Sequence, residues 1–169
     1  MVYPRDGRLE RSPAVTAPSD HPGVWFPPPL WYGLAVLLGV LLNRRWPLPI
    51  PAGSFTTIAG VVFVVGWMAL AFASIGRFRR VHTSLIPIRP AKTLVMAGPY
   101  RYTRNPMYVS LALLTIAAGL FLTTWWPILL LVPTLVIVQQ VVIRPEERYL
   151  RRRFGADYEA YTRRVRRWL

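Results

Sequence analysis

The chain has 169 residues, of which 53% are hydrophobic, and its 21 Lys and Arg residues outweigh 7 Asp and Glu residues to give a net charge of +14. Apolar runs flanked by basic residues are typical of an integral membrane protein and disfavour a nucleic-acid-binding protein. The lack of cysteine excludes disulfides and thiolate metal sites, and His21 and His82 are too isolated to indicate a metal centre.

The first 24 residues are rich in proline and charge and lack the apolar core of a signal peptide, so we expect a disordered tail. Residues 25–169 are expected to form a single membrane domain. Its first two apolar stretches are residues 25–42 and 55–75. At about 1.5 Å per residue, the second is long enough to cross about 30 Å of hydrocarbon.

Two more spans are predicted at residues 107–123 and 125–143. The junction between them, Thr123-Thr124-Trp125-Trp126-Pro127, is short, uncharged and aromatic. Tryptophan is favoured at the lipid–water interface, so this junction is typical of a tight helical hairpin that turns there. The expected fold class is therefore an all-α integral membrane protein with about four transmembrane helices.

Basic residues are concentrated in the N-terminal tail, between the second and third spans, and after the fourth span. The opposite side holds only Arg44 and Arg45. By the positive-inside rule, this asymmetry predicts four spans with both termini in the cytoplasm. The start of the third span and the end of the fourth then meet on the cytoplasmic side. We therefore expect Glu146 and Glu147 to lie close to Asn105 and Tyr108, around a cytoplasmic pocket.

The start of the third span has two interpretations. Asn105 before Pro106 is typical of a helix N-terminus, where the asparagine side chain caps the helix. The same exposed amides can also bind an anion, and Arg104 adds a guanidinium suited to a carboxylate. Arg104 and Tyr108 are four residues apart and are expected to share one helical face.

The end of the fourth span offers the complementary charge. Glu146 and Glu147 are either acidic residues in the first turn of a cytoplasmic helix, or carboxylates that bind a ligand ammonium. Gln139 and Gln140, about two turns earlier, would extend a polar wall into the bilayer. An anion site beside a cation site predicts a ligand with a zwitterionic amino-acid group.

Residues 146–169 are predicted to form cytoplasmic helices, the last of them amphipathic. Tyr158, Tyr161, Val165 and Trp168 recur at helical spacing, with arginines on the other side. Such a helix lies at the membrane interface. It would either anchor the chain to anionic lipid or cover the pocket.

Four motifs in order carry a family resemblance: Leu94-Val95-Met96-Ala97-Gly98-Pro99-Tyr100, Arg104-Asn105-Pro106-Met107-Tyr108, Glu146-Glu147, and Phe154-Gly155-Ala156-Asp157-Tyr158-Glu159-Ala160-Tyr161. Together they resemble the isoprenylcysteine carboxyl methyltransferase family in its broad sense, which includes bacterial phospholipid-methyltransferase-like enzymes. The resemblance covers residues 86–169. The family pattern often has His and Gly where this chain has Asn105 and Ser110, and an asparagine cannot accept a proton as an imidazole does.

The resemblance implies an integral membrane methyltransferase of a bacterial plasma membrane that uses S-adenosylmethionine and releases S-adenosylhomocysteine. Its acceptor would be a lipophilic molecule or membrane lipid with a carboxylate, hydroxyl, thiol or amine. The resemblance implies a cofactor site that consists of Lys92, Thr93, Leu94, Val95, Gly98, Tyr100, Asn105, Pro106, Met107, Tyr108, Glu146 and Glu147. For Glu147, a role in substrate binding or in the fold is the alternative.

Methyl transfer from a sulfonium is an in-line displacement that depends on alignment and on exclusion of water, and it requires neither a metal nor a cysteine. Arg104 and Tyr108 are predicted to position the reactants. Arg144, Arg148, Gln139 and Gln140 are the predicted acceptor-binding residues.

Two alternatives stay open: a small four-span transporter, and a non-catalytic lipid-binding protein. A transporter predicts an ionisable residue deep within a span, and none occurs in residues 55–75 or deep within residues 107–143.

Overall fold

The computed structural model describes residues 27–80 and 94–169, and within these ranges every regular element is a helix, as predicted. The predicted tail (residues 1–24), Lys92 and Thr93 lie outside the described residues. The elements in chain order are α1 (Pro28–Arg45), α2 (Ser54–Arg80), the 3₁₀ helix η1 (Gly98–Arg101), α3 (Pro106–Phe121), α4 (Trp126–Val138), the π-helical turn η2 (Gln139–Ile143) and α5 (Arg144–Arg164).

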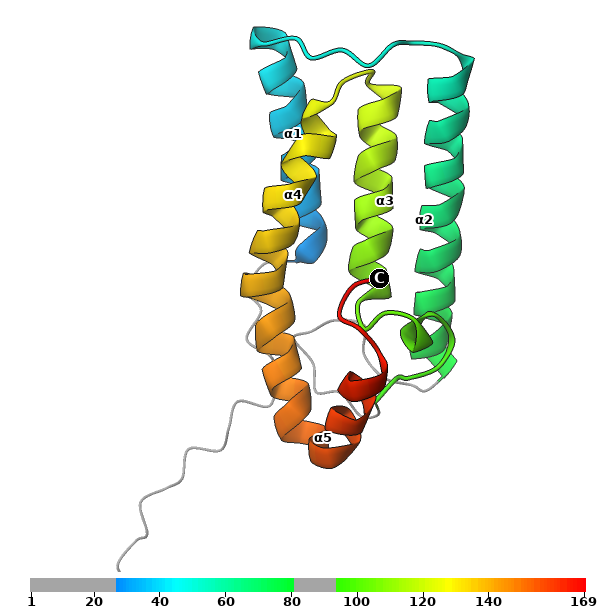
Figure 1. The fold of residues 1–169 in the computed structure, drawn as a ribbon, viewed down its shortest axis with the longest axis vertical. Coiled ribbons are helices and arrows are strands. Elements are labelled where there is room, and N and C mark those ends of the chain that lie inside the picture. Colours follow the sequence, from blue (N-terminus) through cyan, green and yellow to red (C-terminus); the bar gives the residue numbers. More distant parts are fainter. Residues whose placement is uncertain (1–26, 81–93) are drawn as a thin grey trace, which may run out of the picture.

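The four long helices α1 to α4 alternate in direction, and α5 continues from α4 (Figure 1). The α1–α2 and α3–α4 connections meet at one end of the bundle, where the Ile50 amide donates to the Thr123 carbonyl at 2.8 Å and the Trp125 amide to the Leu48 carbonyl at 3.0 Å. The C-terminal end of α2, the start of α3 and the first turn of α5 therefore lie at the opposite end, which we call the α5 end.

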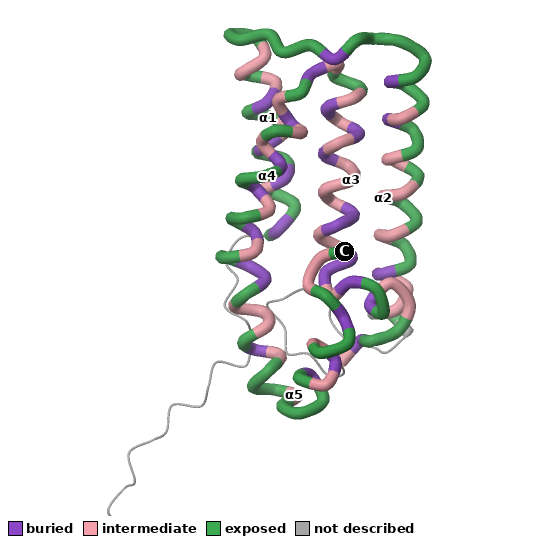
Figure 2. The backbone as a smooth tube through the Cα atoms, in the orientation of Figure 1, coloured by how far each residue is buried: buried purple, intermediate pink, exposed green. Residues whose placement is uncertain are grey.

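The bundle has an apolar exterior as well as an apolar core. Tyr32, Leu131, Val138 and Val142 are buried inside it. Much of the outer surface of α2 and α4 is exposed (Figure 2), and on α2 Phe55 is 85% exposed. Within residues 27–80 and 94–169, two helical segments are long and apolar enough to cross a membrane, Ser54–Arg77 and the continuous stretch Trp126–Arg164, whereas α3 is apolar but shorter.

The predicted spans are close to the observed helices, with differences at their ends. Asn43, Arg44 and Arg45, expected to follow the first span, form the last turn of α1, where cations are favoured by the helix dipole. The fourth span was expected to end near Ile143, with a new helix from Glu146, but the chain stays helical through Pro145. The π turn η2 precedes this proline, whose missing N–H would break the regular α-helical pattern.

The prediction of helix up to the C-terminus was wrong for its last residues. Helix α5 is divided by Gly155, which has a positive φ of 49°, and ends at Arg164. Val165 is extended, so Trp168 does not continue the helical face of Tyr158 and Tyr161. The reason is that backbone carbonyls after Arg164 accept hydrogen bonds from residues 103–105, which precede α3. We call residues 165–169 the C-terminal tail.

A close helix crossing gives a first testable prediction. A Cβ atom at Gly39 of α1 would lie 2.8 Å from the backbone nitrogen of Pro127 in α4. Since neither the backbone nor the proline ring can rotate away, we expect Gly39→Ala to lower the free energy of unfolding by about 1–3 kcal/mol. Thermal unfolding in detergent, followed by tryptophan fluorescence, measures the loss. Gly33→Ala is the control, because open space surrounds Gly33 on the same helix; equal losses would contradict the close crossing.

Candidate functional site

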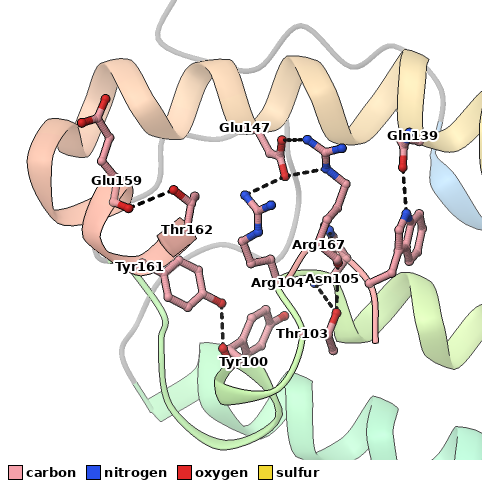
Figure 3. A network of polar contacts seen from close by, with 11 residues as sticks. Tyr100, Thr103, Arg104, Asn105, Gln139, Glu147, Glu159, Tyr161, Thr162 and Arg167 are labelled. Atoms are coloured by element: carbon pink, nitrogen blue, oxygen red, sulfur yellow. Dashed lines mark hydrogen bonds and ion pairs between the residues drawn. The ribbon is translucent and has the colours of Figure 1, made fainter. Parts of the chain in front are cut away.

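Polar side chains from three segments meet at the α5 end of the bundle. The segments are residues 102–108, the first turn of α5, and the C-terminal tail (Figure 3). The Tyr108 hydroxyl donates to Oε2 of Glu146 at 3.0 Å, and Nη1 of Arg104 lies 3.0 Å from Oε1 of Glu147. The predicted meeting of the two glutamates with the start of α3 is thus confirmed.

Glu147 is held by two arginines. Its Oε1 and Oε2 accept hydrogen bonds from Nε and Nη2 of Arg167, at 3.0 and 2.7 Å, in a bidentate arrangement (Figure 3). Arg104 binds the same carboxylate. The Glu147 and Arg104 side chains are only 12% and 13% exposed, so these charge-assisted bonds are shielded from water. Hydrogen bonding to Glu147 also raises the pKa of Arg167.

Arg104 lies before α3, so the expectation that it shares a helical face with Tyr108 was wrong. Its backbone amide donates to the Arg166 carbonyl at 2.9 Å, which ties this residue to the C-terminal tail. Its Nε is buried and has no hydrogen-bond partner among the described residues. Nη1 of the guanidinium therefore binds Glu147, while the buried Nε has no partner in the part of the chain that the structure describes.

Asn105 is the residue before α3, as expected, but its side chain does not cap the helix. Its Nδ2 instead donates to the Arg167 carbonyl at 2.9 Å. The Thr103 hydroxyl donates to the same carbonyl at 3.0 Å and accepts a hydrogen bond from the backbone N–H of Asn105. The buried polar groups before α3 thus hold the C-terminal tail.

Glu146 differs from its neighbour because it forms no ion pair among the described residues. It is half-buried, and Tyr108 is its hydrogen-bond partner. Burial raises the pKa of Glu146 from 4.5 to about 6; the Tyr108 hydrogen bond lowers it and the charge of Glu147 raises it. Glu146 is therefore a carboxylate near neutral pH with no paired cation among the described residues.

The segment before α3 packs beneath this cluster. Gly98 has a φ of +67°, which favours glycine, and a Cβ atom there would lie 2.6 Å from Nε of Arg77. The Tyr100 carbonyl accepts the Tyr161 hydroxyl at 2.7 Å (Figure 3). Of the remaining predicted cofactor residues, Val95 and Pro106 are buried, and Leu94 and Met107 are half-buried.

The four predicted acceptor-binding residues differ in their surroundings. Oε1 of Gln139 accepts the Trp168 indole N–H at 2.8 Å. Gln140, Arg144 and Arg148 are exposed. Gln139 therefore faces the C-terminal tail, while the other three lie on the outer surface.

Thr103, Arg167 and Trp168 belong to the cluster but were not predicted. Arg167 was assigned, with the arginines around it, to the side of an amphipathic helix opposite Tyr158 and Tyr161, because nothing in the sequence distinguishes it from those arginines. Its pairing with Glu147 exists only because the chain leaves the helix after Arg164. Sequence periodicity carries no signal for such a turn.

The cluster presents both signs of charge side by side. Arg104 and Arg167 share the single carboxylate of Glu147, which leaves one positive charge in excess, while Glu146 contributes a negative charge with no paired cation among the residues that the structure describes. This arrangement suits a small ligand that carries both signs. No group of three or more His, Cys, Asp or Glu residues that could hold a metal ion gathers in residues 27–80 and 94–169.

Comparison with known proteins connects this geometry to a family. An uncharacterized protein of Haemophilus influenzae is 38% identical over 63 residues, which is 37% of this chain and 100% of that protein. No solved structure matches the chain. The sequence model of the phospholipid methyltransferase family matches residues 55–157, from the start of α2 into α5. This match covers more than half of the chain and includes both glutamates, so the chain belongs to the phospholipid methyltransferase family.

Proposed function

We propose that the chain is an integral membrane methyltransferase that transfers the methyl group of S-adenosylmethionine to a lipophilic acceptor at the membrane interface. Family membership supports methyl transfer to a lipid-like acceptor. The observation that carries the finer proposal is the pair of opposite charges at the α5 end, with Glu146 beside the Arg104–Glu147–Arg167 network.

The proposed topology has four spans, formed by α1, α2, α3 and α4 with η2, and both termini in the cytoplasm. Two helices of sufficient length and the exposed apolar faces of the bundle support membrane insertion. The concentration of arginine at the α5 end supports its cytoplasmic location. The α1–α2 connection, with Arg44 and Arg45 before it, would then lie on the opposite side.

The residues of the cluster fit the amino-acid part of S-adenosylmethionine. Glu146 would hold the ammonium, because it is a half-buried carboxylate that has no paired cation among the described residues. Arg104 would hold the carboxylate through the excess positive charge of the network, and its buried Nε has no hydrogen-bond partner among the described residues. Glu147 is reassigned from cofactor ligand to the residue that holds both arginines in place.

The bound cofactor would supply an electrophilic methyl group on a sulfonium. The chain's own residues would bind and orient, since Tyr108 holds Glu146 and the apolar helices exclude water from the reacting atoms. The acceptor would carry a carboxylate, hydroxyl, thiol or amine and enter from the bilayer. Exposed Arg144 and Arg148, just after the fourth span, would steer an anionic head group.

Methyl transfer tests this proposal directly. The purified chain in lipid nanodiscs is incubated with methyl-labelled S-adenosylmethionine and lipophilic carboxylic acids, alcohols, thiols or amines. We expect lipid-soluble label with at least one class. Tyr108→Phe removes the hydroxyl bound to Glu146 and is expected to lower the rate about tenfold. Tyr102→Phe is the matched control, because Tyr102 is exposed.

A binding measurement with S-adenosylhomocysteine, made beside this assay, separates the alternatives. A folded chain that binds S-adenosylhomocysteine yet labels none of the four acceptor classes would contradict catalysis and favour a non-catalytic lipid-binding protein. A folded chain without any cofactor binding would contradict the proposal itself.

A further inference from the structure

The C-terminal tail has five residues, and its contacts join three separate parts of the α5 end. Its backbone carbonyls accept the Arg104 amide, the Thr103 hydroxyl and the Asn105 side-chain amide. Its side chains then reach two further partners: Arg167 pairs with Glu147, and the Trp168 indole donates to Gln139. The tail lies outside residues 55–157, which match the family.

We infer that Arg167 is a positioning residue of the proposed cofactor site. It acts through Glu147 on Arg104, and the tail forms a wall of that site. The inference rests on the proposed function, because it concerns the same ligand. It goes further by assigning to Arg167 a partner, Glu147, and a positioning role that neither the family match nor the sequence pattern indicates.

The geometry of the network explains how Arg167 would act. Its two bonds to Glu147, at 3.0 and 2.7 Å, use both carboxylate oxygens and fix the carboxylate plane. The fixed Oε1 then orients the guanidinium of Arg104, 3.0 Å away. Without Arg167, the Glu147 carboxylate would be free to rotate and to form further hydrogen bonds with Arg104. The N–H groups of Arg104 that the proposed ligand needs would then be occupied.

The backbone contacts explain why the tail holds this geometry. The residues on either side of Arg104 both donate to the carbonyl of Arg167. The donors are the Thr103 hydroxyl and the side-chain amide of Asn105. The Arg167 side chain therefore starts from a point fixed against the start of α3 and reaches across to α5. Asn105 thus contributes to the site through the tail, which gives this residue a role that requires no proton transfer.

A double-mutant cycle with S-adenosylhomocysteine as the probe tests the inference. In the full-length chain in detergent, Arg167→Ala is expected to weaken binding about tenfold. In the Glu147→Gln background, the same substitution is expected to have little further effect. Arg167→Lys keeps the positive charge but cannot form the bidentate pair with Glu147, so its affinity is expected to lie between those of Arg167→Ala and the wild type. Arg163→Ala is the control, because Arg163 is an exposed arginine in the last turn of α5.

A second readout needs no ligand. Amide hydrogen exchange of residues 102–105 is expected to be faster in Arg167→Ala than in Arg163→Ala, because the tail that accepts the Arg104 amide is loosened. Tryptophan fluorescence confirms that each variant is folded.

Three results would overturn the inference while the wild-type chain binds the probe: unchanged affinity in Arg167→Ala, an equal loss in the Glu147→Gln background, or unchanged exchange. Absence of binding by the wild-type chain would instead contradict the proposed function. The amide-exchange measurement would still test whether Arg167 holds the C-terminal tail in place.

Discussion

Replacing Glu146 with glutamine is expected to weaken binding of S-adenosylhomocysteine by at least tenfold without lowering the unfolding temperature. Glutamine keeps an oxygen that can accept the Tyr108 hydroxyl but removes the charge that would hold the ligand ammonium. In the ligand-free protein this charge is half-buried and has no ion-pair partner among the described residues. Its removal therefore relieves a desolvation cost.

The pKa of Glu146 adds a pH signature to this prediction. Burial raises the pKa from 4.5 to about 6, so the folded chain binds a proton more tightly than the unfolded chain does. The contribution of Glu146 to the free energy of unfolding therefore falls as the pH rises from about 4.5 to above 6. Affinity for the cationic ligand group changes in the opposite direction, and is expected to decrease as the pH falls through about 6.

Calorimetric titration from pH 5 to pH 8 measures the affinity, and fluorescence-detected melting measures the stability. Glu159→Gln is the matched control, since Glu159 is an exposed acid on the same helix. Unchanged affinity in Glu146→Gln, with a lowered unfolding temperature, would indicate that Glu146 is a structural residue.

The neighbouring substitution, Glu147→Gln, is expected to lower the stability of the fold, unlike Glu146→Gln. It leaves the guanidiniums of Arg104 and Arg167 close together without their shared carboxylate. Breaking a well-buried ion pair costs about 3–5 kcal/mol, but Arg167 is 31% exposed and partly screened. We therefore expect the free energy of unfolding to fall by about 2 kcal/mol.

Denaturant or thermal unfolding in detergent measures this loss, and Asp157→Asn provides a control, because Asp157 is an exposed acid of α5. Raising the salt concentration is expected to affect the difference only weakly, since the Glu147 and Arg104 side chains are mostly buried. A melting temperature equal to that of the wild type would contradict the role assigned to the network.

The sequence predicts the helices well because hydrophobic runs and proline positions are local signals. The hairpin between the third and fourth spans brings Glu146 to Tyr108, and this convergence follows from helix direction alone. The contacts of the C-terminal tail could not be predicted in this way. They depend on the end of α5 at Arg164, after which the chain is extended, and on which of several adjacent arginines faces Glu147.

Asn105 shows the same limit at a single residue. Its position before Pro106 predicts the start of α3 correctly, because proline favours the first turn. The partner of its side chain is the Arg167 carbonyl, more than sixty residues away in sequence, and not the local amides of the helix. Local patterns thus locate this residue, whereas tertiary contacts determine what it does.

The most direct test of the proposed function is equilibrium binding of S-adenosylhomocysteine to the full-length chain in detergent at pH 7.5, with Glu146→Gln measured beside it. We predict saturable binding at one site per chain and a loss of at least tenfold in the variant. A folded wild-type chain that shows no saturable binding, or a variant that binds equally well, would contradict the assignment of Glu146 and its neighbours as the cofactor site.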